Sequence, residues 1–305
     1  MTYYNILSLD GGGIRGLLAC KMLERLERLY PGYLNKVNLI AGTSTGGILA
    51  LGLAAGFTPT EMGDLYQKDG GKIFYQTLWD KLADLDRFMY ADYGNGPLEQ
   101  ALRDKFGDMR LGDLKQNVLI SSFRLDSGSV TKMGVRSWKP KFFQNFESEP
   151  SDRDQKVVDV ALRTSAAPTY FPLYQGFADG GLVANNPSMC ALAQALDTTT
   201  GRQKLNKVTM LSVGTGVMPK WVEGFNENWG FRQWAPHLIT ILMDGVSGVA
   251  DYQCKQILGP RYLRLNALFQ RHISLDSIKE IPYLIELADV EDINDTKKWF
   301  NKYYA

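Results

Sequence analysis

The chain of 305 residues is long enough to bury the core of one large domain or of two small ones, and its 45% hydrophobic and 22% charged residues exclude a disordered chain. Lys and Arg total 34 against 33 for Asp and Glu, so the strong positive field that supports non-specific nucleic-acid binding is not expected. The three cysteines, Cys20, Cys190 and Cys254, are widely spaced, which favours a reducing compartment over a disulfide framework or a zinc site.

Apolar strands and amphipathic helices alternate along most of the chain. The sequence predicts strands at residues 4–9, 37–41, 117–123, 176–178 and 208–213, and helices at 14–30, 46–55, 157–164 and 187–196. This alternation implies an α/β fold, with helices on both faces of a sheet. Beyond residue 219 the sequence becomes aromatic and mostly helical. We interpret that part as an elaboration of the same domain, so residues 1–305 are expected to form one domain.

Two helix starts have recognisable capping residues. Thr58, Pro59 and Glu61 match a capping box with proline in the first helical turn. Asn186 precedes Pro187 and is predicted to be the N-cap of the helix at 187–196.

Residues 39–57 carry no charge over 19 positions, which is the length of a membrane span. Five glycines interrupt the stretch, so a buried strand, a sharp turn and a buried helix explain it better. The N-terminus has neither a positive region nor a cleavable apolar run, and no secretory signal is expected. These features predict a cytoplasmic protein that contacts membranes only from their surface.

Three glycines follow the first predicted strand, in the run Asp10-Gly11-Gly12-Gly13-Ile14-Arg15-Gly16. The run satisfies the dinucleotide fingerprint G-x-G-x-x-G, but the second strand lacks the acid that contacts the ribose. Asp10 would also lie near the pyrophosphate, and no Lys-Ser/Thr pair follows as it would in a P-loop. Open backbone N–H groups at a helix N-terminus instead suit a developing negative charge, as in an oxyanion hole.

A second glycine-rich run, Gly42-Thr43-Ser44-Thr45-Gly46, lies between a buried strand and an apolar helix. Small residues two positions before and after the serine let the chain turn sharply and expose the hydroxyl. In this strand–turn–helix context, the run predicts a nucleophilic serine.

A serine nucleophile needs a base, and the chain has only two histidines. His237 lies near the start of an apolar helix with no loop to present it, and His272 lies in a charged stretch typical of a surface. A carboxylate is therefore the expected base. Asp179, in Asp179-Gly180-Gly181 after a short strand, is the best candidate, although this tripeptide alone is also a common turn.

Together these motifs resemble the patatin-like phospholipases, a family of lipid acyl hydrolases with a Ser–Asp dyad. The chain carries the D-G-G-G-x-R-G motif at residues 10–16, the elbow G-T-S-T-G-G at 42–47, and Asp-Gly-Gly followed by Asn-Asn-Pro at 185–187. The runs S-A-A-P at 165–168 and S-V-G-T-G at 212–216 are also similar to the family. Order and spacing agree over about residues 3–216, and 261–265 is similar to a late strand of patatins.

The resemblance implies a three-layer α/β/α sandwich with a central, mostly parallel sheet. It implies Ser44 as the nucleophile and Asp179 as its proton acceptor, without a cofactor or a metal ion. Backbone donors to the oxyanion are expected from Gly11, Gly12 and Gly13, with Arg15 supporting their loop. The other motif glycines are Gly16, Gly42, Gly46, Gly180 and Gly181.

The leading hypothesis is a phospholipase A or lysophospholipase-like esterase that acts on phospholipid or other acyl esters through an acyl-serine intermediate. The alternative is a phospholipase effector, gated by a nucleotide or a partner, that degrades the cell's own membrane in antiviral defence. Acyl transfer to an acceptor other than water and a non-catalytic binding module are further possibilities. The sequence leaves the oligomeric state open.

Two aromatic segments suggest transient contact with a membrane surface. One is the run 138–143, which pairs Trp138 and Phe142 with lysines, and the other places Trp221, Trp229 and Trp234 within 14 residues. Tryptophan suits a setting that is partly apolar and partly wet, and lysine favours anionic head groups. The alternative is that these aromatic residues pack the C-terminal part onto the sheet.

Overall fold

The computed structural model describes residues 2–73, 94–128, 136–149, 151–218 and 229–304. The strands are β1 (Tyr4–Leu9), β2 (Val37–Thr43), β3 (Asn117–Arg124), β4 (Lys139–Gln144), β5 (Phe177–Asp179), β6 (Val208–Val213) and β7 (Tyr262–Leu265). The helices are α1 (Gly16–Leu29), α2 (Thr45–Ala55), α3 (Pro59–Asp64), α4 (Gly70–Ile73), α5 (Gly96–Phe106), α6 (Val157–Thr164), α7 (Gly181–Ala184), α8 (Ser188–Leu196), α9 (Phe231–Leu258), α10 (Ile281–Val290) and α11 (Asn294–Tyr303).

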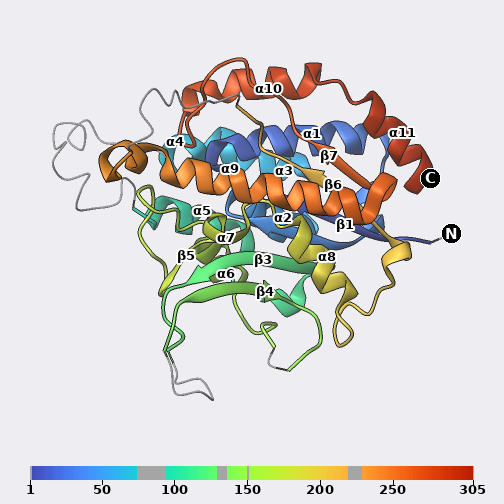
Figure 1. The fold of residues 1–305 in the computed structure, drawn as a ribbon, viewed down its shortest axis with the longest axis horizontal. Helices are drawn as coiled ribbons and strands as arrows, with labels where there is room; N and C mark the ends of the chain where they lie inside the picture. The colour runs from blue at the N-terminus through green and yellow to red at the C-terminus, as the bar shows by residue number, and fades with distance from the viewer. Residues whose placement is uncertain (1, 74–93, 129–135, 150, 219–228, 305) are drawn as a thin grey trace.

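One sheet lies between two layers of helices (Figure 1). Its strands follow the order β4-β3-β2-β1-β6-β7, and β5 pairs with the end of β3. Strands β3, β2, β1, β6 and β7 are parallel, whereas β4 and β5 run antiparallel to β3. The predicted α/β class with a mostly parallel central sheet is confirmed.

Alternate side chains of the sheet enter two different cores, because successive residues of a strand point to opposite faces. Leu7 and Leu9 belong to the core that includes α1, α2 and α10. Ile6 and Met210 belong to the core that includes α8 and α9. Burial on both faces explains why the parallel strands are continuous apolar runs rather than alternating ones.

Most predicted elements agree with the structure. The elements at 4–9, 157–164 and 208–213 match to the residue, and the uncharged stretch 39–57 folds into β2 and α2 as predicted. The capping box at Thr58 and Glu61 is present. In the described part of the chain, no helix combines the length and the hydropathy of a membrane span.

The start of α8 differs from the prediction by one residue. Pro187, not Asn186, occupies the N-cap position. The Asn186 Oδ1 atom nevertheless accepts a hydrogen bond of 3.0 Å from the N–H of Ser188. From the position before the N-cap, Asn186 therefore accepts a hydrogen bond from an N–H group that has no acceptor within the helix.

The part beyond residue 219 adds to the sheet as well as to the helical layers. Strand β7 pairs in parallel with β6, and α10 packs along α1. The two ends of the chain lie on the same side of the molecule (Figure 1), where the rings of Tyr3 and Tyr303 are 5.5 Å apart. The late strand indicated by the similarity at 261–265 is thus present as β7, within a part that is otherwise mostly helical as predicted.

Candidate active site

The sheet register brings Ser44 and Asp179 together from distant parts of the sequence. Strand β2 runs along one edge of β3 and ends with Thr43 opposite Ser121. Strand β5 continues along that edge in the opposite direction and ends with Asp179 opposite Ser122. Because the two strands end at adjacent positions, the residue that follows β2 lies beside the last residue of β5. The Ser44 side chain lies close enough to the Asp179 carboxylate to lower its pKa.

Ser44 occupies a tight turn between β2 and α2. Its φ of 53° and ψ of −123° are sparsely populated by residues other than glycine, and such outliers gather at functional sites. The N–H of Ser44 donates to Thr164 Oγ1 at 2.8 Å. A Cβ atom on Gly42 would lie 2.2 Å from the Gly46 carbonyl oxygen, so this turn requires glycine. The spacing of the G-x-S-x-G motif therefore follows from contacts within the turn.

Asp179 is buried, with an exposed fraction of 3%. Burial raises the pKa of this carboxyl group to about 6, and the hydrogen bonds from Ser44 and from the Gly181 N–H oppose that rise. The Gly181 N–H lies 2.6 Å from Asp179 Oδ1 and fixes the orientation of the carboxylate. Asp179 thus combines a fixed geometry with the proton affinity that a general base near neutral pH requires.

The glycine loop is fixed by contacts on both sides. The Gly11 N–H donates to the Asn185 carbonyl at 3.0 Å, and Arg15 Nε donates to the Gly12 carbonyl at 3.3 Å. Gly11 was predicted to supply an oxyanion donor, but its N–H is already used by Asn185. The N–H groups of Gly12 and Gly13 have no partner among the described residues.

One N–H group beside Ser44 was not predicted as a donor. Thr45 is the first residue of α2, so its N–H has no acceptor within the helix. In serine hydrolases with a G-x-S-x-G turn, the residue after the nucleophile commonly supplies such a donor. The G-x-S-x-G motif itself could have predicted the Thr45 N–H as a donor.

An apolar pocket of about 80 Å³ opens beside these groups. Gly12, Gly13, Ser44, Thr45 and Asp179 all line it. The rest of the lining is largely hydrophobic and includes Ile48, Leu65, Ile73, Leu98, Phe171 and Leu182. The hydroxyl, the carboxylate and the free N–H groups therefore meet at the wall of a pocket suited to an apolar chain.

Comparison with known proteins agrees with this arrangement. The sequence profile of the family described as patatin-like phospholipase matches residues 7–192, which is more than half of the chain. The chain belongs to the patatin-like phospholipase family. Membership implies a lipid hydrolase, as the motifs at residues 10–16 and 42–47 had indicated.

Three relatives illustrate the range of similarity. A cGAMP-activated phospholipase of Pseudomonas aeruginosa is 33% identical over 270 residues, which cover 86% of this chain and 78% of that protein. A cGAMP-activated phospholipase of Vibrio cholerae is 38% identical over 235 residues, covering 69% of this chain and 63% of that protein. Protein teg of Priestia megaterium is 29% identical over 326 residues, covering 95% of each.

The two histidines of this patatin-like chain lie away from Ser44. His237 is exposed on α9, with its ring 6.1 Å from the ring of Trp229. His272 is exposed after β7. Neither belongs to the described lining of the Ser44 pocket. The surface position predicted for His272 agrees with the structure, and His237 lies near the start of a helix as expected.

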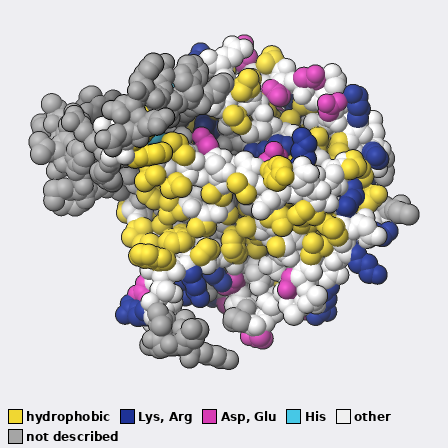
Figure 2. Space-filling view, viewed as in Figure 1, with side chains coloured by type: hydrophobic (Ala, Val, Ile, Leu, Met, Phe, Trp, Pro, Cys, Tyr) yellow, Lys and Arg dark blue, Asp and Glu magenta, His cyan; other side chains and the backbone are white. Residues whose placement is uncertain are grey.

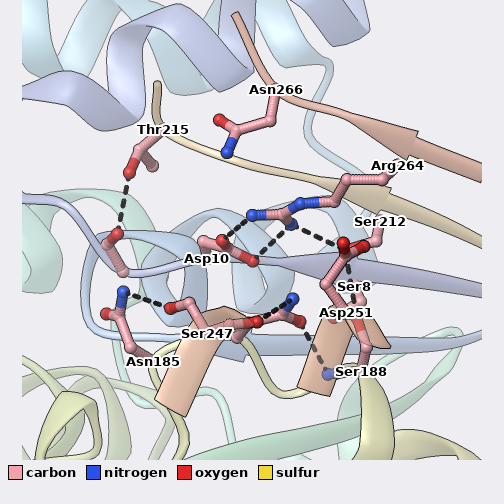
Figure 3. Close-up of polar contacts among 12 residues, drawn as sticks. Ser8, Asp10, Asn185, Ser188, Ser212, Thr215, Ser247, Asp251, Arg264 and Asn266 are labelled. Atoms are coloured by element: carbon pink, nitrogen blue, oxygen red, sulfur yellow. Dashed lines mark hydrogen bonds and ion pairs between the residues drawn. The ribbon is translucent and has the colours of Figure 1, made fainter. Parts of the chain in front are cut away.

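A buried ion pair, missed by the sequence analysis, anchors the residue before the glycine loop. Arg264 of β7 donates from both terminal nitrogens to the two carboxylate oxygens of Asp10, one of these bonds measuring 2.9 Å (Figure 3). Arg264 also donates to Ser212 at 2.7 Å, and Ser188 bridges Ser212 and Ser8. These contacts join β1, β6, β7 and α8 behind the loop. No local sequence pattern could show a pairing across 254 positions.

The aromatic segments divide between surface and core. Trp138 is 73% exposed and Trp234 is 43% exposed, whereas Phe143 is only 2% exposed because it points inward from β4. Trp221 lies outside the described residues. Further exposed hydrophobic residues gather on α9, which crosses the face shown in Figure 2; they are Leu238, Ile241, Leu242, Val249 and Tyr252.

Proposed function

We propose that this protein hydrolyses acyl esters of glycerophospholipids or related lipids, with Ser44 as the nucleophile and Asp179 as its base. The observation that supports this most is the position of the Ser44 side chain next to a buried Asp179, both at the wall of an apolar pocket. Family membership supplies the substrate class.

In the proposed reaction, Asp179 accepts the Ser44 proton as the hydroxyl oxygen attacks the ester carbonyl carbon. The tetrahedral oxyanion accepts hydrogen bonds from the N–H groups of Gly12 and Gly13, and from that of Thr45. Asp179 then returns the proton to the departing alcohol, which leaves an acyl-serine. In the second half, Asp179 takes a proton from water as the water oxygen attacks the acyl carbonyl carbon. The bond to Ser44 Oγ then breaks, and Asp179 returns the proton to Oγ, which releases the fatty acid and restores Ser44.

The substrate meets the site at a membrane surface in this proposal. Exposed Trp138 and the exposed hydrophobic residues of α9 provide apolar contact area. The pocket itself, at about 80 Å³, is well below the about 300–1,000 Å³ typical of ligand sites. An acyl chain therefore requires the pocket to widen.

The test is the release of products from phospholipid vesicles. We expect the wild-type protein to release free fatty acid and lysophospholipid, measured by mass spectrometry, and Ser44→Ala to release neither. Added glycerol as an acceptor separates hydrolysis from acyl transfer, because transfer gives a new acyl ester. A folded wild-type protein that releases no acyl group from any lipid ester would contradict the proposal.

A second candidate function is the same hydrolase gated by a nucleotide and directed at the cell's own membrane. The relatives of P. aeruginosa and V. cholerae are named for activation by cGAMP, and the narrow pocket here is compatible with an enzyme that needs activation. Hydrolysis measured with and without cGAMP distinguishes the two candidates. A rate that rises many-fold supports gating, and an equal rate supports constitutive hydrolysis.

A further inference from the structure

A second cavity, of about 620 Å³, lies behind the glycine loop. This volume is within the about 300–1,000 Å³ of small-molecule sites. The cavity lies among the ends of β1, β6 and β7 and the middle of α9, and its lining is polar. Tyr170, Met243 and Leu275 line both this cavity and the Ser44 pocket, so the two share a wall.

The cavity contains a buried acceptor that has no partner. Asn185 is only 7% exposed, and its Nδ2 donates to Ser247 Oγ at 3.1 Å (Figure 3). Its Oδ1 atom is buried without a hydrogen bond among the described residues. Buried amide oxygens are rarely left unpaired. The atom has almost no accessible surface, so a donor from a ligand reaches it only when the cavity wall shifts.

Arg15 is a second group that can form further hydrogen bonds. Its Nε donates to Gly12, but neither of its terminal nitrogens has a hydrogen-bond partner in the described part of the chain. The guanidinium faces the exposed carboxylate of Asp244 across the cavity lining. A planar donor of this kind suits a phosphate oxygen.

The charges in the cavity select among anionic ligands. Two guanidinium groups, those of Arg15 and Arg264, meet three carboxylates, those of Asp10, Asp244 and Asp251. Inorganic phosphate or a triphosphate would concentrate negative charge against an excess of carboxylates. A cyclic phosphodiester carries one negative charge per phosphate, and the N–H groups of its bases can donate to carboxylate and amide oxygens.

We propose that this polar cavity binds a cyclic dinucleotide and that the ligand acts on the glycine loop. The proposal rests on the gated form of the proposed function and gives it a site. The cavity residues Asp244, Ser247 and Asn266 come from α9 and from the segment after β7, beyond residues 7–192 matched by the family profile.

The loop receives its main contacts from this cavity wall. The Thr215 hydroxyl donates to the Gly11 carbonyl at 2.8 Å, and the Ile14 N–H donates to the Leu275 carbonyl at 2.7 Å. On the other side, the Met243 methyl group lies 2.9 Å from where a Cβ atom on Gly181 would be, directly beside Asp179. A ligand that moves this wall therefore moves both the oxyanion donors and the pocket next to Asp179.

Two glycines of α9 allow a matched test. Gly248 lines the cavity and Gly245 lines neither cavity, and a Cβ atom on either would meet nothing within 4 Å. Gly248→Trp therefore fills the cavity without a backbone clash. Gly245→Trp makes the same change in helix propensity and exposed apolar area outside it.

Calorimetric titration with cGAMP, with inorganic phosphate and ATP as further probes, measures binding to the protein. We expect cGAMP to bind the wild type, Ser44→Ala and Gly245→Trp alike, and Gly248→Trp to bind about tenfold or more weakly. Phosphate and ATP should bind weakly or not at all. With a short soluble ester, cGAMP should raise the rate of the wild type and of Gly245→Trp but not that of Gly248→Trp.

Absence of cGAMP binding to the wild type, or equal binding by Gly248→Trp and Gly245→Trp, would overturn the cavity assignment. The titration of Ser44→Ala tests the cavity independently of the proposed function, because binding of cGAMP does not need catalysis. Binding that depends on Gly248 in a protein without hydrolase activity supports the cavity and contradicts the hydrolase. Hydrolysis by the wild type that never responds to cGAMP, with no binding, contradicts the cavity alone.

Discussion

The two sides of the glycine loop are built in opposite ways. On one side, Ser44 and Asp179 lie at the wall of a small apolar pocket, and their contacts come from residues before 217. On the other side, Asp10 is paired with Arg264 in a larger polar cavity to which α9 and the segment after β7 contribute. The N-terminal motifs thus supply the proposed reacting groups, and the C-terminal third supports the glycine loop from behind.

The largest effect is expected on the apolar side. Ser44→Ala and Asp179→Asn should each lower kcat by about 10⁴-fold or more, because removing one member of a catalytic unit costs nearly as much as removing all of it. His237→Ala and His272→Ala serve as controls and should stay within about threefold, since exposed groups rarely contribute more. Steady-state rates on a soluble ester measure all four variants. Inactivity of a folded His237→Ala protein would contradict the dyad.

On the side of the polar cavity, we expect substitutions to lower the free energy of unfolding more than they lower the catalytic rate. Arg264→Met leaves Asp10 buried without its partner, and breaking such a pair costs about 3–5 kcal/mol. The double variant Asp10→Asn with Arg264→Met should recover much of this loss, because no uncompensated charge remains. Urea denaturation measures the free energy of unfolding of both. Equal stability of the two variants would show that the unpaired carboxylate of Asp10 is not the cause of the lost stability.

The raised pKa of Asp179 predicts two pH profiles of opposite sense. Activity needs the ionised carboxylate, so kcat/KM should fall about tenfold per pH unit below about pH 6. Stability behaves differently, because the folded state binds the Asp179 proton more tightly than the unfolded state. Between about pH 4 and 6 the wild type should therefore lose about 2 kcal/mol relative to Asp179→Asn as pH rises.

Urea midpoints of the two proteins across this range test the second profile. A constant difference between the wild type and Asp179→Asn from pH 4 to 8 would show that Asp179 is not titrating there. A rate that stays level down to pH 4 would assign the base to another group.

The smallest expected effect concerns the approach to lipid. Trp138→Ser should lower the rate on vesicles by several-fold, about 1 kcal/mol for one exposed aromatic contact, and leave the rate on a soluble ester unchanged. Phe143→Ser is the contrast, from the strand β4 that begins directly after Trp138. Since Phe143 is buried, that variant should lose stability and activity on both substrates. Equal losses of rate on vesicles and on the soluble ester for Trp138→Ser would contradict the assignment of Trp138 to lipid contact.

The sequence predicted the site best where the contacts are local. The turn at Ser44 could be recognised because Gly42 and Gly46 contact each other within one motif. Strand β4 could not be recognised, since a Lys-Pro-Lys run is unlike an interior strand. It is tolerated because β4 lies at the edge of the sheet.

Long-range pairing accounts for what the sequence could not predict. Whether Gly11 or its neighbours offer a free N–H depends on the carbonyl of Asn185, which follows α7 and is 174 positions away in the sequence. The partner of Asp10 comes from β7 near the other end of the chain. The motifs therefore predict which residues react, while the fold decides which backbone groups remain free.

The central claim is that Ser44 is the nucleophile and Asp179 its base, and covalent labelling tests it most directly. A fluorophosphonate probe should modify the wild-type protein at Ser44, mapped by mass spectrometry of the labelled peptide. Asp179→Asn should label far more slowly, and His237→Ala should label at the wild-type rate. A label on another residue, or wild-type labelling of Ser44 in Asp179→Asn, would contradict the account.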